Sequence, residues 1–179
     1  MKFHHWILLV LIALIGWIIW AIFTIPIMTI NGVPVDLKYD VLQKELLAQP
    51  HAEANAEGAP IVYMGDYKFA LDRRLASVML KSIDSLSLQE YQAVIDLIAN
   101  EYKLKPILKG RDSFCKLYNK ERDLIRDYNQ NTEAFSSIIG IATDYGDGVL
   151  FEIDKNNYIF VGYTSNWYAN HVHICYYVF

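Results

Sequence analysis

A long stretch without charge near the start of the chain places the strongest constraint on its fold. Residues Trp6 to Ile30 contain no charged side chain, and from Trp6 to Phe23 nearly every residue is apolar. One α-helix needs roughly 20 apolar residues to cross a bilayer. A cleaved signal peptide has a shorter apolar core and then a small-x-small site, which residues 24–30 do not offer. Residues 6–30 therefore predict an uncleaved transmembrane anchor with the lipid bilayer around it.

The orientation of this anchor depends on the basic groups near its ends. Lys2 and the α-amino group precede it, while Lys38 and Lys44 follow it. The number of basic groups is therefore equal on the two sides. A short tail before the span is typical of a signal-anchor, and we base the predicted orientation on it. We expect a cytoplasmic N-terminus and an external C-terminal domain. In a bacterium, that is a single-pass inner-membrane protein with a periplasmic domain.

Net charge limits the partners of the domain outside the membrane. The whole chain has a formal charge of −4, and removing the anchor removes one basic side chain, Lys2, and no acidic one. A mildly acidic domain does not suit nucleic acid, which rewards clusters of Lys and Arg. A basic protein partner remains an alternative, because its charge would be complementary to that of the domain.

The chain divides into four parts by composition. Residues 1–30 are the predicted tail and anchor, and residues 31–48 a turn and a short helix. Residues 49–60 are small, polar and bracketed by prolines, which is typical of a flexible linker. Residues 61–179 are long enough for one compact domain with its own core.

Several local signals predict turns and helices. Asn31-Gly32 between apolar residues predicts a hairpin, because both positions accept positive φ. Residues 36–47 and 67–82 carry apolar residues at helical spacing. Ser87 and Glu90 form a capping box at the start of a further helix that Pro106 limits. Another helix is expected from about residue 112 to 127.

The C-terminal third changes to β-branched and aromatic residues. Three runs, 149–153, 158–163 and 171–179, predict strands. Residues 154–157 form a turn between the first two runs, and residues 164–170 form a longer loop before the third. The sequence therefore predicts an α+β fold: a single transmembrane helix, then a helix-rich segment packed on a C-terminal antiparallel β-meander.

The loop before the last strand holds the predicted partner-binding residues. Trp167 and Tyr168 are adjacent there, and exposed Trp and Tyr often anchor protein interfaces. Asp144 and Asp147 lie in a loop rich in carboxylates and glycines that lacks the spacing of a calcium site. We predict that these four residues contact a protein partner.

Two other pairs of residues are candidates for metal binding and for a disulfide. His171 and His173 share one face of a strand, but a zinc site needs further ligands. No metal or cofactor is therefore predicted, and the two histidines are weak metal-binding candidates. Cys115 and Cys175, the two cysteines of the chain, either form one disulfide in an oxidising compartment or remain buried thiols.

No catalytic signature links these residues, so the sequence favours a binding protein over an enzyme. The leading hypothesis is an immunity-like or inhibitory module that binds a toxin or hydrolase. Two alternatives stay open. One is an accessory subunit of an inner-membrane assembly, and the other is a membrane-anchored hydrolase or metal-dependent enzyme.

Overall fold

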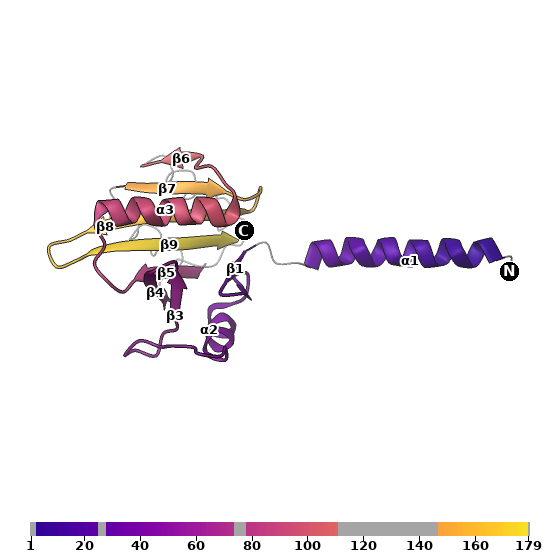
Figure 1. The fold of residues 1–179 in the computed structure, drawn as a ribbon, viewed down its shortest axis with the longest axis horizontal. Helices are drawn as coiled ribbons and strands as arrows, with labels where there is room; N and C mark the ends of the chain where they lie inside the picture. Colours follow the sequence, from indigo (N-terminus) through magenta and orange to yellow (C-terminus); the bar gives the residue numbers. More distant parts are fainter. Residues whose placement is uncertain (1–2, 25–27, 74–77, 111–146, 179) are drawn as a thin grey trace, which may run out of the picture.

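The structure, a computed structural model, describes residues 3–24, 28–73, 78–110 and 147–178. Two layers make up its folded part: an antiparallel sheet, and helices beside it (Figure 1). This arrangement confirms the predicted α+β class. The elements are α1 (Phe3–Thr24), β1 (Thr29–Ile30), β2 (Val33–Pro34), α2 (Tyr39–Leu47), β3 (Ile61–Met64), β4 (Tyr67–Asp72), β5 (Val78–Ser82), α3 (Leu88–Tyr102), β6 (Leu108–Lys109), β7 (Asp147–Glu152), β8 (Asn157–Ser165) and β9 (Asn170–Val178).

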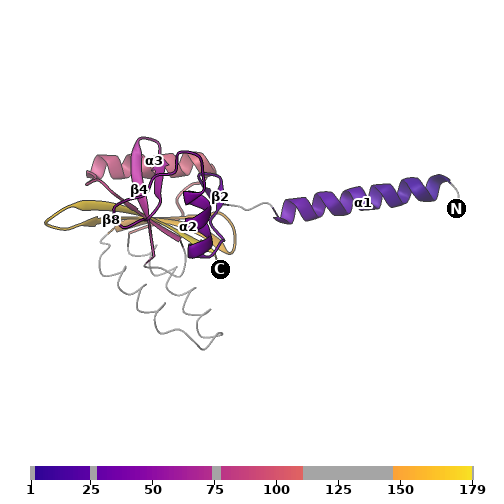
Figure 2. The same ribbon diagram turned by 90° about the horizontal axis from the view of Figure 1, so that it is seen from below.

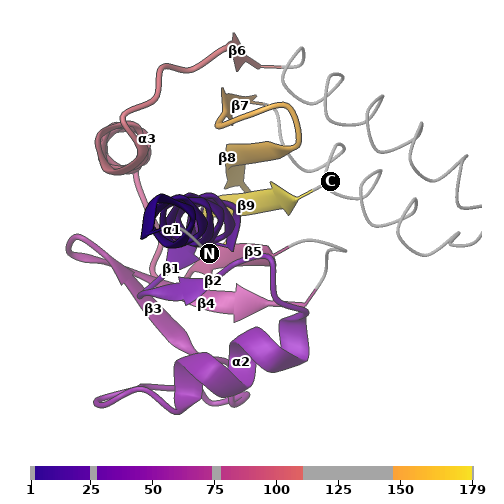
Figure 3. The ribbon, with the colours of Figure 1, turned by 90° about the vertical axis from the view of Figure 1, so that its right-hand side faces the viewer.

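The main sheet has seven strands in the order β3-β4-β5-β9-β8-β7-β6. Figure 3 shows this order from β6 at the top of the view down to β3. The strands β7, β8 and β9 form the predicted C-terminal meander, paired antiparallel. The central position of β9 was not predicted, because it pairs on its other side with β5, a strand nearly one hundred residues earlier.

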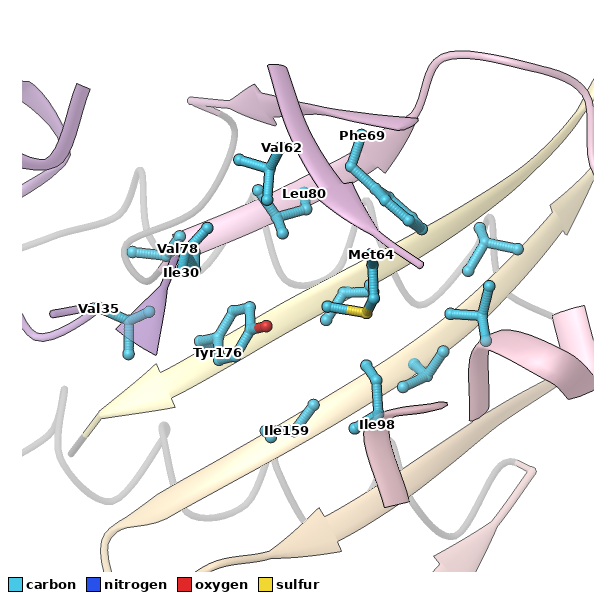
Figure 4. Close-up of a cluster of buried hydrophobic side chains, with 14 of the residues drawn as sticks. Ile30, Val35, Val62, Met64, Phe69, Val78, Leu80, Ile98, Ile159 and Tyr176 are labelled. Atoms are coloured by element: carbon cyan, nitrogen blue, oxygen red, sulfur yellow. The ribbon is translucent and has the colours of Figure 1, made fainter. Parts of the chain in front are cut away.

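The larger hydrophobic cluster lies on the face of the sheet that α3 covers. Residues from β1, β2 and α2 join the same cluster, so the core begins at Met28, soon after α1. Figure 4 shows part of it, with Tyr176 of β9 among side chains from β1, β3 and α3. The labelled members include Ile30, Val35, Val62, Met64, Phe69, Val78, Leu80, Ile98 and Ile159.

A second buried cluster lies on the opposite face of the sheet. It contains Met79, Leu150, Tyr158, Phe160, Cys175 and Tyr177. Strand residues alternate between faces, which explains why Tyr176 and Tyr177 belong to different clusters. Both tyrosines are buried.

Helix α3 begins as its sequence predicts. The hydroxyl of Ser87 accepts a hydrogen bond from the main-chain N–H of Glu90, and the Glu90 carboxylate accepts one from the N–H of Ser87. The helix ends at Tyr102, and Lys103 caps it with a left-handed backbone. Its buried residues are Tyr91, Val94, Ile95 and Ile98, the face that the sequence indicated.

The Asn31-Gly32 hairpin is confirmed, with φ of 49° and 79° at its two turn residues. The short helix that follows is also confirmed as α2. The helix predicted from residue 112 to 127 lies outside the described residues.

The helix predicted over residues 67–82 is wrong, because this segment forms strands β4 and β5. Phe69 and Leu71 are buried on one face of β4, and Ala70 between them points to the other. A strand buried in part on both faces carries apolar residues at spacings that also fit a helix. Gly65, with φ of 58°, makes the tight turn from β3 into β4, so a hairpin is favoured over a helix here.

Hydrogen bonds hold several residues of the predicted linker, 49–60. The side chain of Asn55 accepts bonds from the main-chain N–H groups of Glu57 and Ala59. Gln43 of α2 donates to the carbonyl of Gly58, and Ile61 donates to that of Glu53. The linker's flexibility and the predicted domain boundaries stay predictions.

Helix α1 lies apart from the folded part of the chain (Figures 1 and 2). Its large apolar side chains from Trp6 to Trp20 are exposed. Among the described helices, however, none meets the length and hydropathy that a membrane span requires. The transmembrane anchor is therefore not supported by this finding and stays a prediction from the sequence.

Candidate functional site

The hairpin of β8 and β9 carries the predicted binding residues at its tip. Its strands pair over their whole length, up to Ser165 opposite Asn170. The hairpin projects from the end of the sheet farthest from α1 (Figures 1 and 2). Asn166 fixes the turn, because its side-chain oxygen accepts the main-chain N–H groups of Tyr168 at 3.0 Å and Ala169 at 2.8 Å.

Trp167 and Tyr168 are strongly exposed, with 86% and 77% of their surfaces open to solvent. Their ring centroids are 4.0 Å apart and the rings are tilted by 38°. Two adjacent exposed aromatic rings form an apolar surface that a partner would remove from water. The predicted loop position of both residues is confirmed, whereas their contact with a partner stays a prediction.

The end of the hairpin next to its turn is fastened to the loop that leads from β5 into α3. The N–H of Asn170 donates to the hydroxyl of Ser85 at 3.1 Å, and its carbonyl accepts the N–H of Leu86 at 3.0 Å. The hydroxyl of Tyr163 also donates to the carbonyl of Leu86, at 3.2 Å. These bonds set the direction in which Trp167 and Tyr168 point.

Two more exposed apolar residues belong to this loop and the start of α3. Ile83 and Leu88 are exposed, and the N–H of Ile83 donates to the carbonyl of Lys68 in β4. The sequence analysis missed both residues. Leu88 lies inside the capping box and Ile83 four residues before Ser87, and no local pattern distinguishes either residue from an ordinary core residue.

The two predicted metal candidates lie side by side on β9. The rings of His171 and His173 are 6.3 Å apart. Nδ1 of His171 lies 3.2 Å from the carbonyl oxygen of Ser82. Burial lowers the pKa of His171, as does the positive charge of Lys81, while the Ser82 contact opposes the shift. Within the described part of the chain, no group of three His, Cys, Asp or Glu residues lies close enough to hold a metal ion.

A pocket of about 540 Å³ opens beside His171. Strands β4, β5 and β9 supply one wall, including Lys81 and His171, and α2 with residues 55–59 supplies another. Arg73 lies at its border, paired with the carboxylate of Asp40 and 5.0 Å from the centroid of the Tyr39 ring. The sequence could not place Lys81 here, because the segment that contains it was predicted as a helix.

Of the two predicted acidic residues, the structure describes the backbone of Asp147. Asp147 begins β7, where its backbone pairs with Tyr163 of β8. That register places its backbone beside β8, two residues before Ser165 and outside the turn. Asp144 lies outside the described residues.

The side chain of Cys175 has no exposed surface. Burial raises its pKa to about 12, and a hydrogen bond with Tyr177 only partly offsets this rise. Such a thiol is a poor nucleophile and metal ligand, since both roles need the thiolate. Cys115 lies outside the described residues, so the predicted disulfide stays a prediction.

Comparison with known proteins gives no assignment for this arrangement: no family model, curated protein or solved structure matches the chain.

Proposed function

We propose that this chain is a membrane-anchored binding protein whose contact surface is the tip of the β8–β9 hairpin. The observation that carries the proposal is the exposure of Trp167 and Tyr168 on a turn fixed by Asn166. Large aromatic residues held in one orientation lose little conformational entropy on binding and often dominate interface energies.

The anchor in this proposal rests on the charge-free sequence from Trp6 to Ile30. The end of the domain farthest from α1 carries the hairpin tip (Figure 1). With α1 in the bilayer, the tip would point away from the membrane surface. We place the domain in the periplasm of a bacterium, held at the inner membrane with the N-terminus in the cytoplasm.

The partner we propose is a toxin or hydrolase that the domain inhibits. A mildly acidic, tethered domain without a recognisable catalytic site suits that role. The two competing hypotheses are a subunit of an inner-membrane assembly and an enzyme, and the experiment below separates them from the inhibitor.

The experiment compares proteins captured from native membranes by the tagged full-length chain and by the Trp167→Ala/Tyr168→Ala variant. The control variant, Val41→Ala/Leu47→Ala, truncates two exposed apolar residues of α2. We expect one soluble enzyme with the wild type and the control, and its loss with the tip variant. Purified components should then show at least about 30-fold weaker binding by the tip variant, since interface anchors contribute about 2 kcal/mol.

Two results would contradict the proposal. Unchanged capture by the tip variant would exclude the tip as the contact surface. Recovery of several integral membrane proteins would favour the assembly subunit. A separate test of the anchor is alkaline extraction of membranes, which should leave the full chain in the pellet and release a chain that lacks residues 1–27.

A further inference from the structure

A second pocket lies at the end of the domain nearest α1. It has a volume of about 430 Å³ and lies between β1, β3, the C-terminal part of α3 and Tyr176 of β9. Its apolar walls include Ile30, Met64 and Leu97. Figure 4 shows Tyr176 close to Ile30, with its hydroxyl directed toward the side of Met64.

The polar groups around this pocket are held in fixed positions. The hydroxyl of Tyr102 donates to the carbonyl of Thr29 at 3.2 Å, which fastens β1 to the end of α3. Tyr176, with 1% of its surface exposed, is hydrogen-bonded to Tyr102. Burial raises the pKa of Tyr102 to about 12 and raises the pKa of Tyr176 well above its ordinary value, so both hydroxyls remain neutral and polar.

The charge that the described lining residues give this pocket is negative. Among the described residues that line it, Glu101 is the charged one. Within the described part of the chain, Arg73 pairs with Asp40 and no Lys, Arg or His side chain forms an ion pair with Glu101. Partial burial raises the pKa of Glu101. A carboxylate that has lost some of its water gains from a nearby cation.

The end of α3 adds to this preference. Asn100 and Glu101 lie in the last turn of the helix, which contains no basic residue. The carbonyl groups at a helix C-terminus carry partial negative charge and favour a cation. Lys103 follows the helix but does not line the pocket.

We propose that this pocket binds an organic ammonium group, with the carboxylate of Glu101 as its counter-charge. The carbon atoms of the ligand would contact Met64, Leu97 and the ring of Tyr176. A bare divalent metal suits the site less well, because such ions take several oxygen ligands and Glu101 is the one carboxylate among the described residues that line the pocket. The ammonium group has two sources, a free amine or the headgroup of a phospholipid such as phosphatidylethanolamine. The lipid source rests on the proposed anchor, whereas the free amine does not.

Amide NMR shifts of the full-length chain test this site. The chain is placed in nanodiscs of phosphatidylglycerol, which lacks an ammonium group, and titrated with ethanolammonium chloride against sodium chloride. We expect saturable shifts at Asn31, Gly65 and Asn100 with ethanolammonium alone. Nanodiscs that contain phosphatidylethanolamine should produce the same shifts without added amine when the lipid is the source. In detergent micelles the free-amine titration tests the pocket independently of the anchor.

Two variants and one control make the result decisive. Glu101→Gln removes the counter-charge with little change in shape and should weaken binding about tenfold, as for one charge-assisted contact. Asn100→Lys places a competing ammonium at the pocket and should abolish the shifts. Asp96→Asn removes a carboxylate from the same helix outside the pocket and should change nothing. No saturable shift up to about 100 mM amine, or equal binding by Glu101→Gln, would overturn the proposal.

Discussion

The main-chain N–H of Asn170 donates a 3.1 Å hydrogen bond to the hydroxyl of Ser85. The carbonyl of the same Asn170 accepts the N–H of Leu86. Both backbone groups at the start of β9 are therefore held by the loop that begins α3. The direction of the β8–β9 tip is consequently coupled to the helix that covers the core, although the tip itself is in solvent.

Replacing Asn166 with Ala should weaken partner binding more than it weakens the fold. The substitution removes the oxygen that accepts the N–H groups of Tyr168 and Ala169, so the two aromatic rings would have to be ordered on binding. Since the turn is exposed, the free energy of unfolding should fall by about 1 kcal/mol or less. Urea unfolding and binding to the captured partner measure the two effects. Asn166→Asp keeps the acceptor and should bind like the wild type; equal weakening by both variants would contradict the argument.

The capping box of α3 should make a pH-dependent contribution to stability. Ser87→Ala should lower the free energy of unfolding by about 1 kcal/mol through loss of the cap. Hydrogen bonds from the backbone and hydroxyl of Ser87 lower the pKa of Glu90 below its ordinary value of 4.5. The ionised form is therefore favoured in the folded state, and its contribution is present above pH 4.5 and lost as the pH falls through the folded pKa.

The measurement is urea unfolding of the wild type and Glu90→Gln from neutral pH to acid. We expect the variant to be less stable at neutral pH, and the difference to shrink below pH 4.5. A difference that stays constant over this range would show that the carboxylate charge does not contribute.

Local signals predicted the parts of the fold that depend on local chemistry. The Asn31-Gly32 turn depends on the φ angles of its own two residues, and the Ser87–Glu90 cap on hydrogen bonds between its own residues. Both can therefore be predicted from the local sequence. The C-terminal meander followed from aromatic and β-branched runs joined by short connections. Strands β4 and β5 did not follow, because their apolar spacing fits both a helix and a strand buried on two faces.

The same ambiguity limited the candidate site. The exposed position of Trp167 and Tyr168 depends on a loop, which the sequence marks with polar residues. The position of Lys81 near His171 depends on the pairing of β5 with β9, a long-range contact that leaves no local pattern. The pocket that contains Glu101 likewise requires β1, β3 and α3 to meet.

Two glycines should resist substitution for different physical reasons. A Cβ on Gly148 would lie 2.3 Å from two ring atoms of Phe160, so Gly148→Ala should cost about 1–3 kcal/mol by overpacking. A Cβ on Gly32 meets nothing within 4 Å, but φ there is +79°, so Gly32→Ala should cost about 1–2 kcal/mol in backbone strain. Urea unfolding measures both.

Second substitutions separate the two reasons. Phe160→Leu should recover part of the stability lost in Gly148→Ala, because it removes the atoms that clash. Gly32→Asn should be tolerated better than Gly32→Ala, since Asn adopts positive φ more readily. Recovery in neither pair would contradict this explanation.

The pKa of His171 should lie below the ordinary value of 6.5 and rise when Lys81 is replaced by Gln. Burial is the larger cause of the shift and the charge of Lys81 the smaller. The variant should therefore move only part of the way back to 6.5. Titration of the imidazole ring signals by NMR, with His171→Gln to assign them, gives both values. A variant that titrates at the wild-type pH would show that Lys81 does not act on this ring.

The thiol of Cys175 should be inert while the chain is folded. Its pKa of about 12 leaves very little thiolate at pH 8, and the side chain has no exposed surface. In the Cys115→Ser variant, where Cys175 is the remaining cysteine, alkylation by iodoacetamide should be at least about a thousandfold slower than in guanidinium chloride. Mass spectrometry after timed quenching follows the reaction.

Comparable rates in the two conditions would mean that β9 opens readily, in conflict with its pairing on both sides with β5 and β8. Slow alkylation of the folded Cys115→Ser variant would instead show that β9 stays paired in the sheet without a disulfide.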